Sequence, residues 1–173
     1  MQLKTVTLPG KRLAGFVCKT TTVEGRNLKD VPAFWRDYIE SGRMEKLNGE
    51  TFVKDRRHYG VWFPENPATR ILEYFVGVEA GKDDPVPPEY EVRELRPASY
   101  MVFPSFPPAA DGPELIVAVQ KTYARIYGEW IPRLGCDLNV LASDFELYDD
   151  RVWTDGGKVC DIYIPVIPQT LRR

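Results

Sequence analysis

The segment from residue 113 to residue 168 constrains the fold most, because a long helical pattern is followed by two short alternating patterns. In the second part of the segment Phe145 and Leu147 share one face of a strand, while Glu146 and Tyr148 share the other. We expect the preceding helix to cover Phe145 and Leu147. A carboxylate and a phenol then lie together on the opposite face. The helix is marked by apolar residues at three- and four-residue steps: Ile116, Val119, Tyr123, Ile126, Tyr127, Trp130 and Leu134.

A second alternating stretch at residues 159–166 predicts a neighbouring strand, in which Asp161 and Tyr163 are paired in the same way. An acid among aromatic rings is an environment suited to a flat cation. The alternative is that Glu146 is a solvated strand residue and Tyr148 is ordinary half-buried packing.

The first half of the chain shows the same order of elements. Strands are expected at residues 5–8 and 12–22, and a helix follows in which Asp30 is the predicted N-cap. Two further strands are expected at residues 57–63 and 70–80, separated by a proline-containing turn. A proline-rich linker over residues 81–90 precedes a strand at residues 98–103 and the long helix.

The sequence therefore predicts one α+β domain over residues 1–173, made of duplicated β-α-β-β halves at about 1–84 and 91–173. The halves are expected to form one curved antiparallel sheet with two long helices on one face and a ligand groove on the other. Large aromatics and acids at Tyr59, Trp62 and Glu79 are available for that groove. A second small core or a homodimer contact would also explain them.

Composition excludes several classes of function. The chain is 43% hydrophobic and 28% charged with a net charge of −2, so it has no basic excess for direct DNA binding. Neither a signal peptide nor an apolar run of membrane-spanning length is evident, so a cytoplasmic protein is expected, without membrane association. The odd number of cysteines, Cys18, Cys136 and Cys160, argues against a disulfide framework or a CxxC zinc site.

Common catalytic arrangements are also missing from the sequence. His58 is the only histidine, no serine lies in a GxSxG turn, and no glycine-rich phosphate loop occurs. We therefore expect no metal and no cofactor. Carboxylate chemistry remains open, because Glu146, Glu79 and Asp161 are candidates to share one groove and a desolvated glutamate suits acid or base catalysis.

The order and spacing of several motifs resemble those of GyrI-like small-molecule-binding domains, which also form the effector-binding ends of AraC- and MerR-type multidrug-sensing transcription activators. The first predicted strand begins within a few residues of Met1, so we expect the stand-alone form, without a helix-turn-helix. The motifs are Glu73-Tyr-Phe-Val-Gly-Val-Glu79, Ala98-Ser-Tyr-Met-Val-Phe103, Trp130-Ile-Pro-Arg-Leu-Gly135, Asp144-Phe-Glu-Leu-Tyr148, Asp155-Gly-Gly157 and Cys160-Asp-Ile-Tyr-Ile-Pro-Val166.

This resemblance implies binding of amphipathic cationic or aromatic small molecules, with Glu146 as the central counter-charge. The residues expected to line the site are Tyr148, Tyr163, Trp62, Phe103, Glu79 and Tyr59. A hydrolase of cyclopropane-bearing toxins, with Glu146 as general base, is the main alternative. A gyrase-inhibitor-like protein-binding role is a third.

Overall fold

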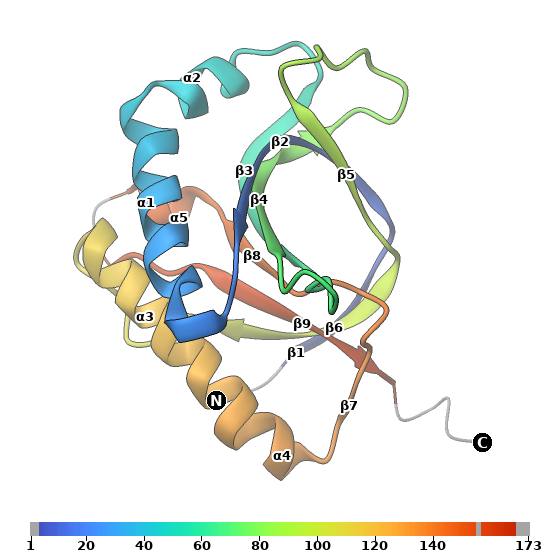
Figure 1. The fold of residues 1–173 in the computed structure, drawn as a ribbon, viewed down its shortest axis with the longest axis vertical. Helices are drawn as coiled ribbons and strands as arrows, with labels where there is room; N and C mark the ends of the chain where they lie inside the picture. Colours follow the sequence, from blue (N-terminus) through green and yellow to red (C-terminus); the bar gives the residue numbers. More distant parts are fainter. Residues whose placement is uncertain (1–3, 155–156, 169–173) are drawn as a thin grey trace. The chain divides into compact units, whose positions relative to one another are not determined.

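Antiparallel strand pairing organises the protein, and the α+β class expected from the sequence is confirmed (Figure 1). The computed structural model describes residues 4–154 and 157–168. It divides into two compact units, with Met1–Gly10 and Arg96–Arg173 in unit 1 and Lys11–Leu95 in unit 2. Of the expected turn at Asp155-Gly-Gly157, the first two residues lie outside the described part.

Unit 2 is a sheet with the strand order β3-β4-β2-β5 and a helix packed on one face. Trp35 of the helix donates through Nε1 to Tyr74 Oη over 2.8 Å, and Tyr38 Oη shares a 3.1 Å hydrogen bond with His58 Nδ1. These contacts bury that face of the sheet beneath the helix. The elements are β2 (Lys11–Thr20), η1 (Val23–Gly25), α1 (Asn27–Glu40), α2 (Arg43–Asn48), β3 (Val53–Phe63), β4 (Leu72–Ala80) and β5 (Glu91–Leu95).

Unit 1 is a sheet with the strand order β1-β6-β9-β8, and a short strand, β7, also pairs with β9. Its long helical segment begins where the side chain of Asp111 accepts a hydrogen bond from the backbone N–H of Glu114 over 2.8 Å. The elements are β1 (Lys4–Leu8), β6 (Ala98–Pro104), α3 (Gly112–Arg125), η2 (Ile126–Trp130), α4 (Ile131–Leu134), β7 (Asp137–Leu138), β8 (Phe145–Tyr148), α5 (Asp150–Trp153) and β9 (Asp161–Ile167).

The long helix is not continuously α-helical. Its middle, η2, is a π-helical turn between α3 and α4. Pro132 follows this turn and has no N–H to donate to the carbonyl of Gly128, so the regular α-helical ladder is broken there. Periodicity of apolar residues predicted the helix but not this change of pitch.

The predicted N-cap of the first helix is wrong. Helix α1 begins at Asn27, and Arg26 occupies the cap position without a side-chain cap hydrogen bond. Asp30 instead lies in the first turn, where its carboxylate accepts hydrogen bonds from Thr20 Oγ1 over 2.7 Å and from Arg26 Nε over 3.2 Å. Its partners come from tertiary packing and from the helix itself.

The bounds of the two units differ from the expected halves, because each unit contains a strand from the other half of the sequence. β1 pairs with β6 in unit 1, and β5 pairs with β2 in unit 2. The proline-rich residues 81–90 therefore lie within unit 2.

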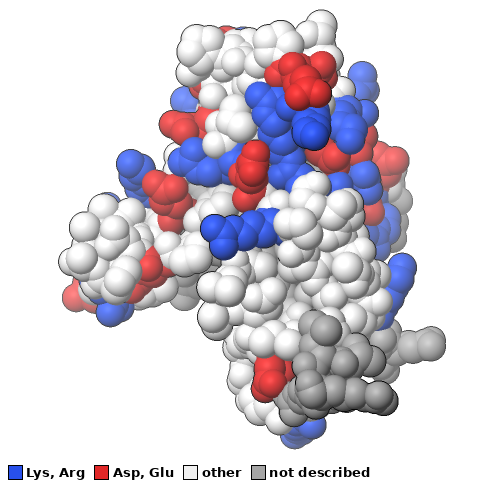
Figure 2. Space-filling view, turned by 90° about the vertical axis from the view of Figure 1, so that its right-hand side faces the viewer, with Lys and Arg blue, Asp and Glu red and all other residues white. Residues whose placement is uncertain are grey.

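On the face drawn in Figure 2, Lys and Arg side chains gather in one area, where Asp and Glu interrupt them, and much of the remaining described surface is uncharged. None of the helices in residues 4–154 and 157–168 combines the length and the apolar character that a membrane span requires.

Candidate functional site

Glu146 is a buried acid in the middle of β8, where only 2% of the residue is exposed. Tyr148, two residues further along the strand, donates a hydrogen bond from Oη to Glu146 Oε2 over 3.0 Å. The alternation predicted from the sequence thus places the acid and the phenol on one face and in contact. The burial of Cys160 and the nearby Glu146 charge raise the pKa of the Cys160 thiol well above its ordinary value.

The face that carries Glu146 is the one that the helical segment covers. Glu146 pairs with Ile162 of β9, and Ile162 pairs with Phe103 of β6, so these side chains project to the same side. The ring of Phe103 stacks on Trp130 of η2, with the centroids 5.5 Å apart and the planes 11° apart. The expectation that the helix covers Phe145 and Leu147 is therefore wrong. The side chains alternate along the strand as predicted, but the helix covers the side that carries Glu146.

The opposite face of the same sheet carries an aromatic cluster. Phe145 pairs with Tyr163, and their rings stack at 4.4 Å. Tyr100 meets Phe145 edge-on at 5.2 Å. The cross-strand register thus separates Tyr163 from Glu146, so the expectation that both line one site is wrong on this point. Phe103, by contrast, does share the face of Glu146.

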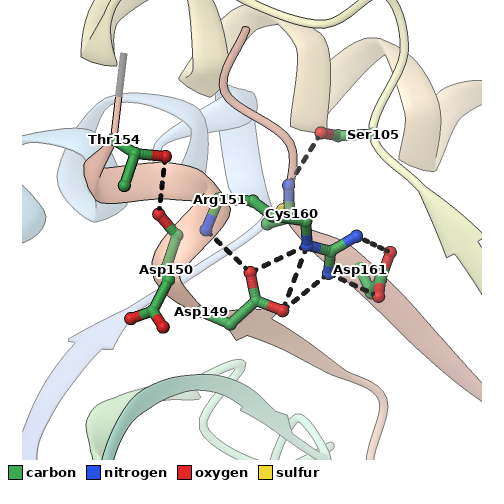
Figure 3. A network of polar contacts seen from close by, with 7 residues as sticks. All are labelled: Ser105, Asp149, Asp150, Arg151, Thr154, Cys160 and Asp161. Carbon is green, nitrogen blue, oxygen red and sulfur yellow. Dashed lines mark hydrogen bonds and ion pairs between the residues drawn. The ribbon is translucent and has the colours of Figure 1, made fainter. Parts of the chain in front are cut away.

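Asp161 lies on the aromatic face, where Arg151 binds it. Arg151 Nη2 donates to Asp161 Oδ2 over 2.7 Å, and Arg151 Nε donates to Asp149 Oδ1 over 2.8 Å. Figure 3 shows the guanidinium between the two carboxylates, which come from different segments of unit 1. A guanidinium in this position offsets the charge of Asp161, which makes this acid less suited to hold a ligand cation.

In unit 2 the predicted site residues divide between the two faces of the sheet. Tyr59 pairs with Gly77, so it projects to the same side as Glu79, two residues along β4. Trp62 pairs with Tyr74 on the other side, and their ring centroids are 4.5 Å apart. Trp62 therefore belongs to the face that α1 covers and is not on the face of Tyr59.

Glu79 is held by two basic residues. Lys11 Nζ lies 2.5 Å from Glu79 Oε2, and Lys54 Nζ lies 2.8 Å from Glu79 Oε1. Burial alone would raise the pKa of Glu79, but the two lysines outweigh it and the pKa lies below its ordinary value. The positive charge beside Glu79 is thus supplied by two side chains of the protein itself.

Two further residues that lie close to the candidate acids were not predicted, Asp144 in unit 1 and Lys11 in unit 2. Asp144 accepts a hydrogen bond from Tyr127 Oη of η2 over 3.1 Å, and burial raises the pKa of Asp144 to about 6. Lys11 was also missed, because its closeness to Glu79 depends on the register between β2 and β4. The described residues hold no group of three or more His, Cys, Asp or Glu side chains placed to bind a metal ion.

A family model described as integron-associated effector-binding protein matches residues 4–166. None of the curated proteins compared with the chain matches it.

Several solved structures share the fold. SAV2435 bound to tetraphenylphosphonium is 21% identical with a TM-score of 0.75, and 100% of this chain and 98% of that chain are covered. An integron cassette protein from the mobile metagenome of Vibrio cholerae is 15% identical with a TM-score of 0.59, covering 95% of each chain. The EcmrR C-terminal domain is 13% identical with a TM-score of 0.55, covering 96% of this chain and 97% of that domain.

Proposed function

This chain belongs to the family of integron-associated effector-binding proteins, and we propose that it binds amphipathic cationic or aromatic small molecules with Glu146 as the buried counter-charge. The family match and the shared fold confirm the recognition of a GyrI-like effector-binding domain from the sequence motifs. Tetraphenylphosphonium, named with SAV2435, is a cation of this class. Its charge is surrounded by aromatic rings, which matches the chemistry around Glu146.

The burial of Glu146 carries the proposal. An ionised carboxylate removed from water costs several kcal/mol unless nearby charges and hydrogen bonds compensate. A bound organic cation would stabilise the charge of this buried carboxylate further, and the ring faces of Tyr148 and Phe103 on the same side would each add about 0.5 to 2 kcal/mol. Glu79 and Asp161 are weaker candidates, because Lys11 and Arg151 already bind them at 2.5 Å and 2.7 Å.

Trp130 lies over the face of the sheet that carries Glu146 and Phe103, and so it affects how a ligand reaches that face. It occupies the ring face of Phe103 that a ligand ring would use. A ligand ring that stacks on this face of Phe103 would therefore have to displace the Trp130 side chain. Three other residues that the sequence predicts for the site, Tyr163, Trp62 and Tyr59, are not part of the proposed contact with Glu146.

The test is Glu146→Gln, which keeps the shape of the side chain and removes its charge. We expect the affinity for tetraphenylphosphonium, measured by calorimetric titration, to fall about 10- to 100-fold, which corresponds to about 1.4 to 2.8 kcal/mol. The affinity for the neutral analogue triphenylphosphine oxide should fall less than about threefold, since this ligand has no net charge for Glu146 to stabilise. The unfolding midpoint should hold or rise, because the substitution removes a charge whose desolvation is costly at this buried position.

Asp161→Asn is the matched control, an acid-to-amide change on the other face of the same sheet. It should leave the affinity for tetraphenylphosphonium within about threefold of wild type, since Arg151 offsets the charge that it removes. Equal losses for both ligands in Glu146→Gln, or no loss for either, would place the site around another group. Turnover of a cyclopropane-bearing electrophile that disappears in Glu146→Gln would instead support the hydrolase.

The proposal includes no direct contact with DNA. The chain has 23 Lys and Arg against 25 Asp and Glu. Phosphate-binding surfaces depend on a clustered basic excess. The Lys and Arg side chains that gather on the face in Figure 2 are interrupted by Asp and Glu. Fluorescence anisotropy with duplex DNA at physiological salt should therefore show no sequence-dependent binding below about 1 μM. Sub-micromolar preference for one duplex over another would contradict this.

A further inference from the structure

The ammonium group of Lys11 lies between an acid and an aromatic ring on the face of unit 2 away from α1. Its Nζ is 2.5 Å from Glu79 Oε2 and 5.9 Å from the centroid of the Tyr59 ring. The side chains of Lys11 and Glu79 are 17% and 11% exposed, so both charges are largely removed from water. The three residues come from three neighbouring strands, β2, β3 and β4.

A buried carboxylate beside a ring face is the arrangement that recognises organic ammonium ions. We propose that Glu79 and Tyr59 form a cation site that Lys11 occupies from within, and that Lys11 thereby determines specificity by excluding external ammonium ligands from this face. The class of ligand that the site would take without Lys11 is a primary alkylammonium, since that is the group now in place.

The electrostatics agree with an occupied site. Lys11 and Lys54 together hold the pKa of Glu79 below its ordinary value despite burial, so the carboxylate is ionised at neutral pH. The two lysines differ in exposure, with the Lys54 side chain at 56% and Lys11 at 17%. Solvent screens the Lys54 contact more strongly, which makes Lys11 the main occupant.

Chemical rescue tests the proposal. Lys11→Ala removes three methylene groups and the ammonium, which together correspond to n-propylammonium. We expect n-propylammonium chloride to bind Lys11→Ala at least about tenfold more tightly than wild type and to raise its unfolding midpoint in a thermal-shift titration. Sodium chloride at equal ionic strength and neutral n-propanol should not have this effect. The gain should vanish in Lys11→Ala/Glu79→Gln, which lacks the acid.

Lys46→Ala is the matched control. Lys46 Nζ also lies 5.9 Å from a tyrosine ring, that of Tyr90, and 3.3 Å from Glu89. Its side chain is 61% exposed and that of Glu89 is 49% exposed, so solvent competes for both charges. Removal of Lys46 should therefore create no measurable site for n-propylammonium.

Absence of rescue in Lys11→Ala would overturn the proposal, and so would equal rescue in Lys46→Ala. If Lys11→Ala does not fold alone, recovery of folded protein by n-propylammonium and not by n-propanol supports the site, and no recovery counts against it.

Wild type gives an independent measurement, since n-propylammonium should leave the NMR signals of Lys11 and Glu79 unchanged. Displacement of Lys11 by n-propylammonium would contradict the proposal that Lys11 excludes external ammonium ligands. None of these outcomes depends on Glu146, so failure here is separable from failure of the proposed function.

Discussion

Gly77→Ala is expected to lower the free energy of unfolding by about 3 kcal/mol or more. Gly77 lies in β4, between Tyr59 of β3 and Gly15 of β2. An added Cβ would be 2.2 Å from the backbone oxygen of Ala14 and 2.7 Å from the ring of Phe75. Because the first of these atoms belongs to a paired strand, relief requires the sheet itself to shift. Urea denaturation followed by circular dichroism measures the loss.

Gly128→Ala is the control for this substitution. Gly128 is exposed in η2, and an added Cβ would meet nothing within 4 Å. The same change should therefore be neutral or stabilise by up to about 1 kcal/mol, because alanine favours helical backbone over glycine. A loss below about 1 kcal/mol in Gly77→Ala would show that the sheet relaxes around the new methyl group.

Acid should destabilise the protein through His58, by about 3 kcal/mol between pH 7 and pH 4. His58 is 1% exposed and shares a hydrogen bond with Tyr38 Oη. Burial lowers the pKa of His58 to about 4, and the nearby Asp55 charge offsets this only in part. The unfolded chain binds the proton near pH 6.5, so between these values the unfolded state carries more protons and stability falls as the pH falls.

His58→Asn isolates this contribution, since the amide has a polar atom for Tyr38 Oη and does not titrate. At neutral pH the variant should be less stable than wild type, because the smaller side chain leaves a cavity. That difference should shrink by about 3 kcal/mol at pH 4. Urea unfolding at several pH values measures it, and a difference independent of pH would mean that folded His58 titrates normally.

Titration of Asp144 changes the stability in the opposite direction to that of His58. For this reason wild type must be compared with His58→Asn at each pH. The pKa of Asp144 is raised to about 6, so the folded state binds this proton more readily than the unfolded chain. The folded protein therefore gains stability as the pH falls through 6 toward the ordinary value of 3.8. The pH profile of wild type contains both effects, whereas the difference between wild type and His58→Asn contains only that of His58.

Spacing along a strand decides which neighbours share a face, and that part of the site could be predicted. Glu146 and Tyr148 are two residues apart and are in contact through a 3.0 Å hydrogen bond. Tyr59 and Trp62 are three residues apart, and they lie on opposite faces of their sheet. Because side chains alternate between the two faces of a strand, this spacing alone excludes a site that both Tyr59 and Trp62 line.

Register between strands has no comparable signal in one sequence. Pairing of Phe145 with Tyr163 places Tyr163 on the side away from Glu146, and a shift by one residue would reverse this. The side that the helix covers is likewise set by contacts such as the stack of Phe103 on Trp130. Both depend on which apolar surfaces meet over a long distance along the chain.

The sequence by itself determined the α+β class, the positions of most strands and helices, and the recognition of an effector-binding domain, because these follow from local periodicity and motif order. Tertiary structure alone decided that Lys11 lies beside Glu79 and Arg151 beside Asp161. Lys11 is 68 residues from Glu79 along the chain and Arg151 is ten from Asp161, yet both pairs are in contact. Coulomb energy depends on distance in space and on burial, and the fold sets both.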